Sequence, residues 1–154
     1  MATLQLTRLT LLFASSLIIS GCATNISGDP RYPIGYVDGA EYHTTQALPG
    51  IAYRDLFGNL RSIEFWPPNS VPTVIHPHGE IIVIPSGTSV RVTSIQLEQN
   101  IEMGPVIWIF ADVTSGPFVQ ARADVSRISI HERGPQPGLL LCRRDESILA
   151  VTQD

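Results

Sequence analysis

The stretch TSVRVTSIQLE, Thr88–Glu98, alternates apolar and polar residues with one slip of phase. Val90 and Val92 are two residues apart, and the next apolar pair, Ile95 and Leu97, follows one residue out of phase. Residues two apart share a face of a strand, so the slip at the intervening Thr-Ser requires a β-bulge or a sharp bend. The stretch therefore predicts a long, bent strand in a mainly β domain.

Short apolar stretches with turn signals surround this strand. Gly58 and Asn59 separate IAYRDLF from LRSIEFW and suit a two-residue hairpin turn with glycine at positive φ. Thr-Ser-Gly-Pro joins PVIWIFADV to FVQARADV and predicts a second hairpin, with Trp108 in the core. EIIVIP, residues 80–85, is continuously apolar, which is typical of a strand buried on both faces. The prolines of WPPNSVP break the sheet before it.

The fold class follows from these strands. No window after Gly50 keeps a helical apolar period free of Pro or Gly, and RISIHE, LLLC and SILAVT add further short strands. The pattern predicts a mainly β domain, a small antiparallel barrel or a sandwich. The segment IPSGTSVRVTSIQLE with GPVIWIFADVTSG resembles the middle of an SH3-like barrel. That resemblance implies a binding module for peptidoglycan stems or protein partners.

The amino-terminal segment has the pattern of a targeting signal. Arg8 is the only basic side chain before an apolar run over residues 9–19, which is shorter than the roughly 20 residues of a transmembrane helix. The run ends in LIISGC. This ending resembles the lipobox of bacterial lipoproteins, over residues 1–22. The resemblance implies cleavage after Gly21 and a diacylglycerol on the thiol of Cys22. An ordinary secretory signal and an uncleaved anchor are the alternatives.

The resemblance also implies a location and a domain division. Ala23, rather than Asp, follows the lipidated cysteine, which implies the outer membrane if the source is Gram-negative, with the domain facing the periplasm or the cell surface. We expect a signal peptide over 1–21, a lipidated tether or extended arm over 22–49, and a β-rich domain over 50–154. Apolar residues of the arm are expected to lie along the domain: Tyr32, Ile34, Tyr36 and Val37.

The charge pattern excludes one class of partner. The chain has 14 acidic residues against 10 basic ones, all of them arginine, and a formal net charge of −4. No polybasic patch is present for nucleic acid or anionic headgroups. We therefore expect no nucleic-acid partner, membrane attachment through the lipid alone, and an envelope protein or peptidoglycan as the partner.

HPHGE contains the candidate metal ligands. His76, His78 and Glu80 alternate and would share one face of a strand. Imidazole and carboxylate together suit Zn²⁺, Mn²⁺ or Fe²⁺. With EIIVIPSG, the stretch resembles the metal-binding motif of cupins, but the Glu follows too closely and no further His comes soon after. Only His43 and His131 remain to complete a site, and an exposed polar loop is the alternative.

Three other features of the sequence bear on structure or function. Cys142 and Trp66 each have two interpretations, and residues 143–146 have one. With Cys22 acylated, Cys142 in GLLLCRR is an unpaired thiol, either reactive or paired with another molecule, or else a small buried hydrophobe. Residues 143–146, RRDE, predict a charged turn between the last two strands. Trp66, before two prolines, is either a recognition element or a cap on the core.

The expected function is therefore that of a non-enzymatic, outer-membrane-anchored lipoprotein whose β-domain binds an envelope partner. No nucleophile elbow, phosphate loop or pair of acids with readable spacing is present, and the covalent lipid on Cys22 is the only expected cofactor. The alternative is a small metal-binding envelope protein or a metal-dependent enzyme that uses His76, His78 and Glu80.

Overall fold

The computed structural model describes residues 23–32, 34–74, 77–100, 104–133 and 140–152. The predicted signal peptide, Cys22 and His76 lie outside these residues. No helix in the described part of the chain is long and apolar enough to cross a membrane. The secondary-structure elements of the described residues are β1 (Thr24–Asn25), β2 (Glu41–Thr44), β3 (Leu48–Arg54), β4 (Leu60–Phe65), β5 (Gly79–Ile84), β6 (Ser89–Asn100), β7 (Gly104–Val113), β8 (Arg122–Asp124), the 3₁₀ turn η1 (Ser126–Ile128), β9 (Ile130–Arg133), β10 (Leu140–Arg143) and β11 (Leu149–Val151).

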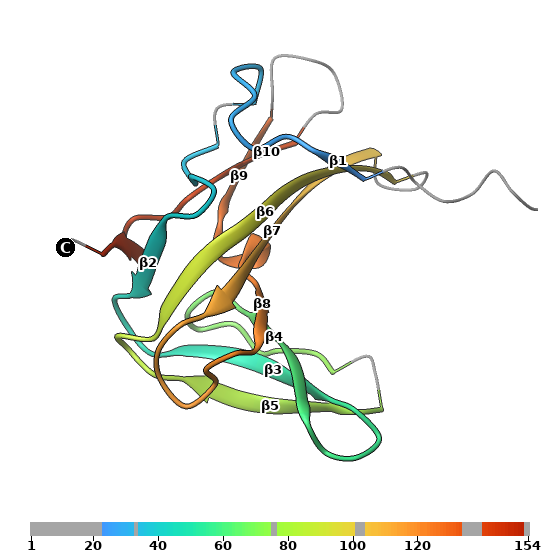
Figure 1. Ribbon diagram of the computed structural model, residues 1–154, viewed down its shortest axis with the longest axis vertical. Helices are drawn as coiled ribbons and strands as arrows, with labels where there is room; N and C mark the ends of the chain where they lie inside the picture. Colours follow the sequence, from blue (N-terminus) through green and yellow to red (C-terminus); the bar gives the residue numbers. More distant parts are fainter. Residues whose placement is uncertain (1–22, 33, 75–76, 101–103, 134–139, 153–154) are drawn as a thin grey trace, which may run out of the picture.

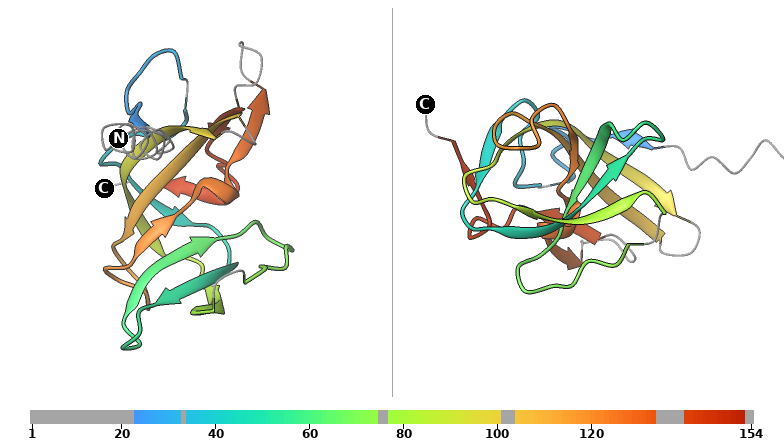
Figure 2. Two further views of the ribbon diagram at one scale, coloured as in Figure 1. Left: turned by 90° about the vertical axis from the view of Figure 1, so that its right-hand side faces the viewer. Right: turned by 90° about the horizontal axis from the view of Figure 1, so that it is seen from below.

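Most strands form one strongly curled sheet (Figures 1 and 2). Its order is β11-β2-β6-β7-β8-β4-β3-β5, with β1 added beside β6, while β9 and β10 form a separate pair. The mainly β fold predicted from the sequence is confirmed. One arrangement was not predicted: β8 pairs antiparallel with β7 but parallel with β4. That parallel pair joins the two halves of the sheet.

The long strand predicted around Val92 is β6, and it bends where the sequence indicates. The register with β7 shifts between Val92 and Ser94, so the predicted bulge is confirmed. Val90, Val92 and Ile95 are all almost completely buried. The extra residue thus keeps the apolar side chains on the core face along the whole strand.

The core fills the inside of the curl. Its largest fully buried side chains come from both halves of the sheet, from the last strand and, for Val125, from the residue between β8 and η1: Phe65, Leu48, Ile51, Ile63, Ile84, Ile95, Ile107, Ile109, Leu149, Val90, Val92 and Val125. Branched aliphatic residues dominate this set, as expected for side chains that pack on a pleated surface.

The two predicted hairpins are present, with longer connections. The β3–β4 loop runs from Asp55 to Asn59 rather than over two residues, and Gly58 has a φ of 83°. The Asp55 carboxylate accepts hydrogen bonds from the backbone N–H groups of Phe57 and Asn59, both at 2.9 Å. This local acceptor stabilises a wider turn. The β7–β8 connection likewise extends beyond the predicted Thr-Ser-Gly-Pro.

The prediction for EIIVIP is wrong. Strand β5 lies at the end of the sheet order and, in the part of the chain that the structure describes, pairs only with β3. Ile81 is 57% exposed and Val83 is 69% exposed, so one face of the strand is open. A continuous apolar run does not distinguish a central strand from an edge strand with an apolar outer face.

The segment predicted as an arm contributes to the sheet and the core. β1 and β2 both pair with β6, and Ile26, Tyr36 and Tyr42 are buried. Val37, in contrast, is 64% exposed. The hydroxyl groups of Tyr36 and Ser129 are 2.9 Å apart, which connects this segment to the chain beyond η1.

Candidate functional site

Strand pairing aligns a row of side chains on the outer face of the sheet, opposite the core. Phe110 on β7 is opposed to Asp124 on β8, and Asp124 is opposed to Glu64 on β4. Cross-strand neighbours share a face, so these three side chains point the same way. Strands β7 and β8 are consecutive in the sequence, whereas β4 is distant from both, and only the parallel β4–β8 pair brings the two carboxyl groups together.

Trp108 belongs to this outer face and not to the core, which corrects the sequence prediction. Its neighbours Ile107 and Ile109 are 1% and 0% exposed and point inward. Trp108 and Phe110 alternate with them and face outward, half-buried. In VIWIF every residue is apolar, so the sequence does not distinguish the two faces.

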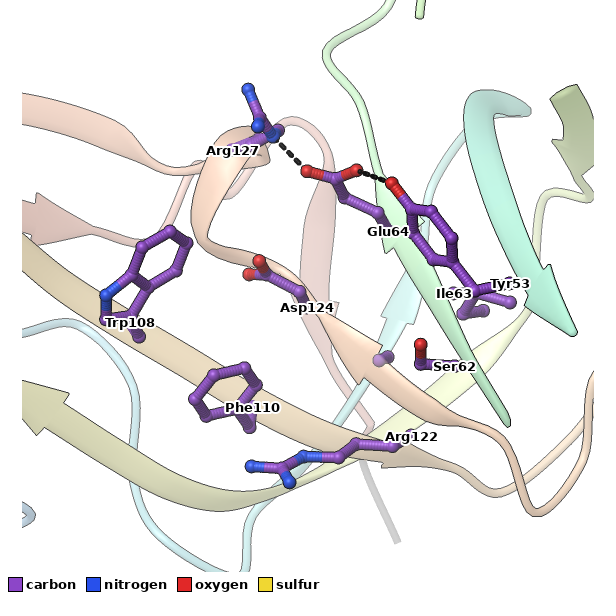
Figure 3. Close-up of a pocket in the computed structure, with 10 residues that line it drawn as sticks. Tyr53, Ser62, Ile63, Glu64, Trp108, Phe110, Arg122, Asp124 and Arg127 are labelled. Carbon is purple, nitrogen blue, oxygen red and sulfur yellow. Dashed lines mark hydrogen bonds and ion pairs between the residues drawn. The ribbon is translucent and has the colours of Figure 1, made fainter. Parts of the chain in front are cut away.

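These side chains line a hollow of about 500 Å³, which we name the aromatic groove (Figure 3). Its outward side chains come from β3, β4, β7, β8 and η1: Tyr53, Ser62, Glu64, Trp108, Phe110, Arg122, Asp124 and Arg127. Its volume lies within the range of about 300–1,000 Å³ that is usual for ligand sites.

Glu64 is held firmly on one side of the groove. Its carboxylate is ion-paired with the guanidinium of Arg127, and the Tyr53 hydroxyl donates to its Oε2 atom at 3.0 Å. Arg127 also lies over the Trp66 ring, 4.6 Å from its centroid. Trp66 therefore supports the edge of the groove through Arg127. Burial, and then the hydrogen bond to Glu64, raise the pKa of Tyr53 to about 12.

Asp124 is less well compensated than Glu64. The backbone N–H of Ser126 donates to its Oδ1 atom at 2.9 Å. Within the described residues it has no ion-pair partner. Burial raises the pKa of the Asp124 carboxyl, and the negative charge of Glu64 adds to this, although the hydrogen bonds from Ser126 oppose it. The groove thus holds one stabilised carboxylate beside one that is costly to ionise.

The aromatic side of the groove is pre-organised. The rings of Trp108 and Phe110 are nearly parallel, at 11°, with centroids 6.5 Å apart. The indole N–H of Trp108 donates to Glu98 Oε2 at 2.7 Å, which fixes the ring. The guanidinium of Arg122 lies 4.2 Å from the Phe110 centroid. Three flat groups are therefore held in a row before any ligand arrives.

No family model, curated protein or solved structure matches this chain. The groove is accordingly interpreted from its own chemistry. It combines flat apolar surface with donors and acceptors of balanced charge, an arrangement suited to binding a polar ligand with an apolar face.

The described part of the chain does not assemble the predicted metal ligands. Both His78 and Glu80 are exposed near the start of β5, and Glu80 contacts Arg54 at 3.4 Å. His43 lies on β2 and His131 on β9. Among the described residues, no group of three or more His, Cys, Asp or Glu side chains is arranged to hold a metal ion. Since His76 lies outside them, the metal hypothesis stays a prediction.

Cys142 is a buried residue of β10, 1% exposed. Its Sγ atom lies 3.2 Å from Nδ1 of His131 and 3.6 Å from the carbonyl oxygen of Ile107. Burial raises the pKa of the thiol to about 12, which disfavours the reactive thiolate. The structure thus favours the buried-hydrophobe interpretation over the reactive thiol.

Sequence reasoning missed the groove residues for an identifiable reason. Ser62 and Glu64, and likewise Arg122 and Asp124, alternate with buried residues, which indicates polar outer faces on two strands. That signal was present. Their convergence was not readable, because it depends on a parallel pairing between strands that are distant in the sequence.

Proposed function

We propose that this chain is an outer-membrane-anchored bacterial lipoprotein whose β-domain binds an envelope partner, an assembly component or the cell wall, in the aromatic groove without catalysing a reaction. The observation that carries the binding proposal is the outward placement of Trp108 and Phe110 among balanced charges. The lipobox resemblance at Cys22 supports the anchor.

The anchor and the groove are compatible in one molecule. A single acyl chain gives only marginal attachment, whereas two or three hold a protein at a membrane. The domain then needs no membrane-binding surface of its own, and the groove is available for a partner within reach of the membrane. Aromatic side chains are enriched among the residues that dominate binding energy, so we expect Trp108 to be the principal anchor.

The anchor is tested by Cys22→Ser in the full-length chain. We expect loss of lipid labelling and accumulation of a longer, unprocessed precursor. Cys142→Ser is the matched control, because it removes the other cysteine of the chain and should leave lipid labelling intact. Normal processing and membrane fractionation of Cys22→Ser would contradict the anchor.

The groove is tested by cross-linking in cells. A photoreactive phenylalanine analogue replaces Phe110 in the groove and, as the matched control, Phe57, which is 88% exposed on the β3–β4 loop. We expect a discrete cross-linked product, protein or cell wall, from position 110 only, and its loss on Trp108→Ala. Equal products from both positions, or a product that is unaffected by Trp108→Ala, would reject the groove as the binding site.

The metal-dependent alternative is tested by metal analysis of the purified full-length protein. Stoichiometric metal that is lost in a His76→Ala/His78→Ala double variant would favour a metal-binding protein over the function proposed above. If the double variant keeps the metal, the histidines of HPHGE are not its ligands.

A further inference from the structure

We propose that the aromatic groove binds an uncharged saccharide chain, whose pyranose rings lie against Trp108 and beside the stacked pair of Phe110 and Arg122, while their hydroxyl groups bond to the charged side chains around them. This inference rests on the proposed binding function and specifies the class of ligand. Its structural basis is the arrangement in Figure 3, where Asp124 lies between the aromatic side and Glu64.

The aromatic side supplies a flat surface. The near-parallel rings of Trp108 and Phe110 are two residues apart on β7, and the Glu98 carboxylate fixes the indole. The face of an aromatic ring carries partial negative charge, so it attracts the polarised C–H groups on the flat side of a sugar. Because the rings are already held in place, little side-chain entropy is lost on binding.

The polar groups around the rings match hydroxyl groups. Arg122 has no ion-pair partner within the described residues, so its N–H groups are available to ligand oxygen atoms. Asp124 offers carboxyl oxygens, and its pKa is raised by burial, so it is also suited to donating a hydrogen bond when protonated. A hydroxyl group both donates and accepts, and it can therefore pair with either residue.

The mixed charges of the groove disfavour strongly charged ligands. When Asp124 is ionised, Glu64 and Asp124 are balanced by Arg122 and Arg127. A nucleic-acid phosphate would meet two carboxyl groups, and binding to nucleic acid depends instead on an excess of Lys and Arg. An ammonium group would meet two guanidinium groups. An uncharged polyhydroxylated ligand avoids both penalties.

The position of the groove disfavours an extended peptide. Peptides that add to a sheet bind through backbone groups of an open edge. The groove lies over β7, β8, β4 and β3, and at Phe110, Asp124 and Glu64 the strand is paired on both sides within the sheet. Hydrogen bonds to a ligand must therefore come mainly from side chains, which suits hydroxyl groups better than a peptide backbone.

The test is direct titration of the full-length protein in detergent. The probes are a hexamer of β-1,4-linked N-acetylglucosamine, cellohexaose, and a cell-wall stem peptide without sugar. Trp66→Phe leaves Trp108 as the only tryptophan of the chain, so its fluorescence reports on the groove itself. We expect a saturable change in emission with at least one of the saccharides and none with the peptide.

Three variants locate the binding. Trp108→Ala should weaken saccharide affinity by about tenfold or more, as for a central binding residue, when titration is followed by calorimetry. Arg122→Ala should also weaken it, and it tests the groove even if Trp108→Ala does not fold, because the exposed Arg122 side chain makes no ion pair in the described chain. Phe57→Ala, outside the groove, should leave affinity unchanged.

The outcomes separate the two proposals. Binding of the peptide but not of the saccharides, or no saccharide binding together with a partner cross-linked at Phe110, would overturn the ligand class and leave the binding function standing. Saccharide binding unaffected by Trp108→Ala and Arg122→Ala would overturn the site. If no probe binds in the titrations and no cross-link forms specifically from position 110, both the saccharide proposal and the proposed binding function are overturned.

Discussion

Glu64 and Asp124 are directly opposed across the parallel pair β4–β8, so two carboxyl groups face one groove. Like charges opposite each other destabilise a sheet. Arg127 and Tyr53 compensate Glu64, while Asp124 keeps the cost of a half-buried carboxylate. A carboxylate whose burial lowers the stability of the folded protein is typical of binding sites when it lines a groove rather than the core. Binding sites often keep residues that a purely structural position would replace with more stabilising ones.

Replacing the carboxyl of Asp124 by an amide should therefore stabilise the protein. Asp124→Asn keeps an oxygen to accept the Ser126 N–H but removes the charge. We expect the free energy of unfolding at neutral pH to rise by about 1 kcal/mol, the usual scale of a single substitution. Thermal or denaturant unfolding of the full-length protein measures it.

The pH dependence of that gain follows from the direction of the pKa shift. The pKa of Asp124 is raised in the folded state, so the folded protein binds the proton more tightly than the unfolded chain. Stability is then retained in acid and lost as pH rises through the folded pKa. The advantage of Asp124→Asn should vanish in acid and grow toward neutral pH. Asp112→Asn, at an exposed acid outside the groove, is the control, and a gain independent of pH would refute the argument.

Ile109 and Trp108 are neighbours on β7, but their truncation should affect different properties. Ile109→Ala should mainly lower stability, and Trp108→Ala should mainly weaken binding. Ile109 is fully buried, so Ile109→Ala should lower the free energy of unfolding by about 2–5 kcal/mol. Trp108 is half-buried on the outer face, and Trp108→Ala should cost clearly less while abolishing the cross-link from position 110. Denaturant unfolding of both variants compares them. A larger loss of free energy of unfolding for Trp108→Ala than for Ile109→Ala would indicate that Trp108 is a core residue.

The sequence was sufficient to predict the bulge and the hairpins of the sheet, although not the lengths of the hairpin loops. The bulge after Val92 and the hairpin around Gly58 follow from residue periodicity and turn chemistry, which act within a few residues. The exposure of Ile81 did not follow, because an edge position is a property of the completed sheet order. The same limit applies to the groove, since the proximity of Glu64 and Asp124 depends on a long-range parallel pair.

Gly50 is a position where even one methyl group is excluded. A Cβ atom there would lie 2.8 Å from the carbonyl oxygen of Glu64 and 2.7 Å from Cδ1 of Ile84. Gly50→Ala should therefore destabilise the protein by about 1–3 kcal/mol, the usual cost of overpacking. Denaturant unfolding gives the value.

A second variant identifies which contact sets that cost. Ile84→Val removes the Cδ1 methyl group but leaves the backbone oxygen in place. In the Gly50→Ala background it should recover little stability, because the sheet backbone at Glu64 cannot move without breaking its pairing. Full recovery of the free energy of unfolding would mean that the clash is with the Ile84 side chain alone.

Arg144 connects the amino-terminal segment to the last strand. Its side chain is only 11% exposed, and its guanidinium donates to the carbonyl oxygens of Gly35 at 3.1 Å and Leu149 at 2.6 Å. It also lies over the Tyr42 ring, 5.1 Å from the centroid. The charged turn predicted around it thus contains one arginine that is part of the packing.

Arg144→Ala should consequently lower the free energy of unfolding by about 2 kcal/mol, since it leaves two carbonyl groups without their charged donor. Arg144→Lys should recover little, because an ammonium group cannot reproduce a planar fork that bonds and stacks at once. Its neighbour provides the control: Arg143 is 53% exposed and, within the described residues, forms an ion pair only with Glu132, which is 50% exposed, so Arg143→Ala should cost well under 1 kcal/mol. Denaturant unfolding of the three variants, with proteolysis of the segment around Gly35 as a second readout, checks the argument. Equal losses for the two alanine variants would mean that Arg144 is a surface charge like any other.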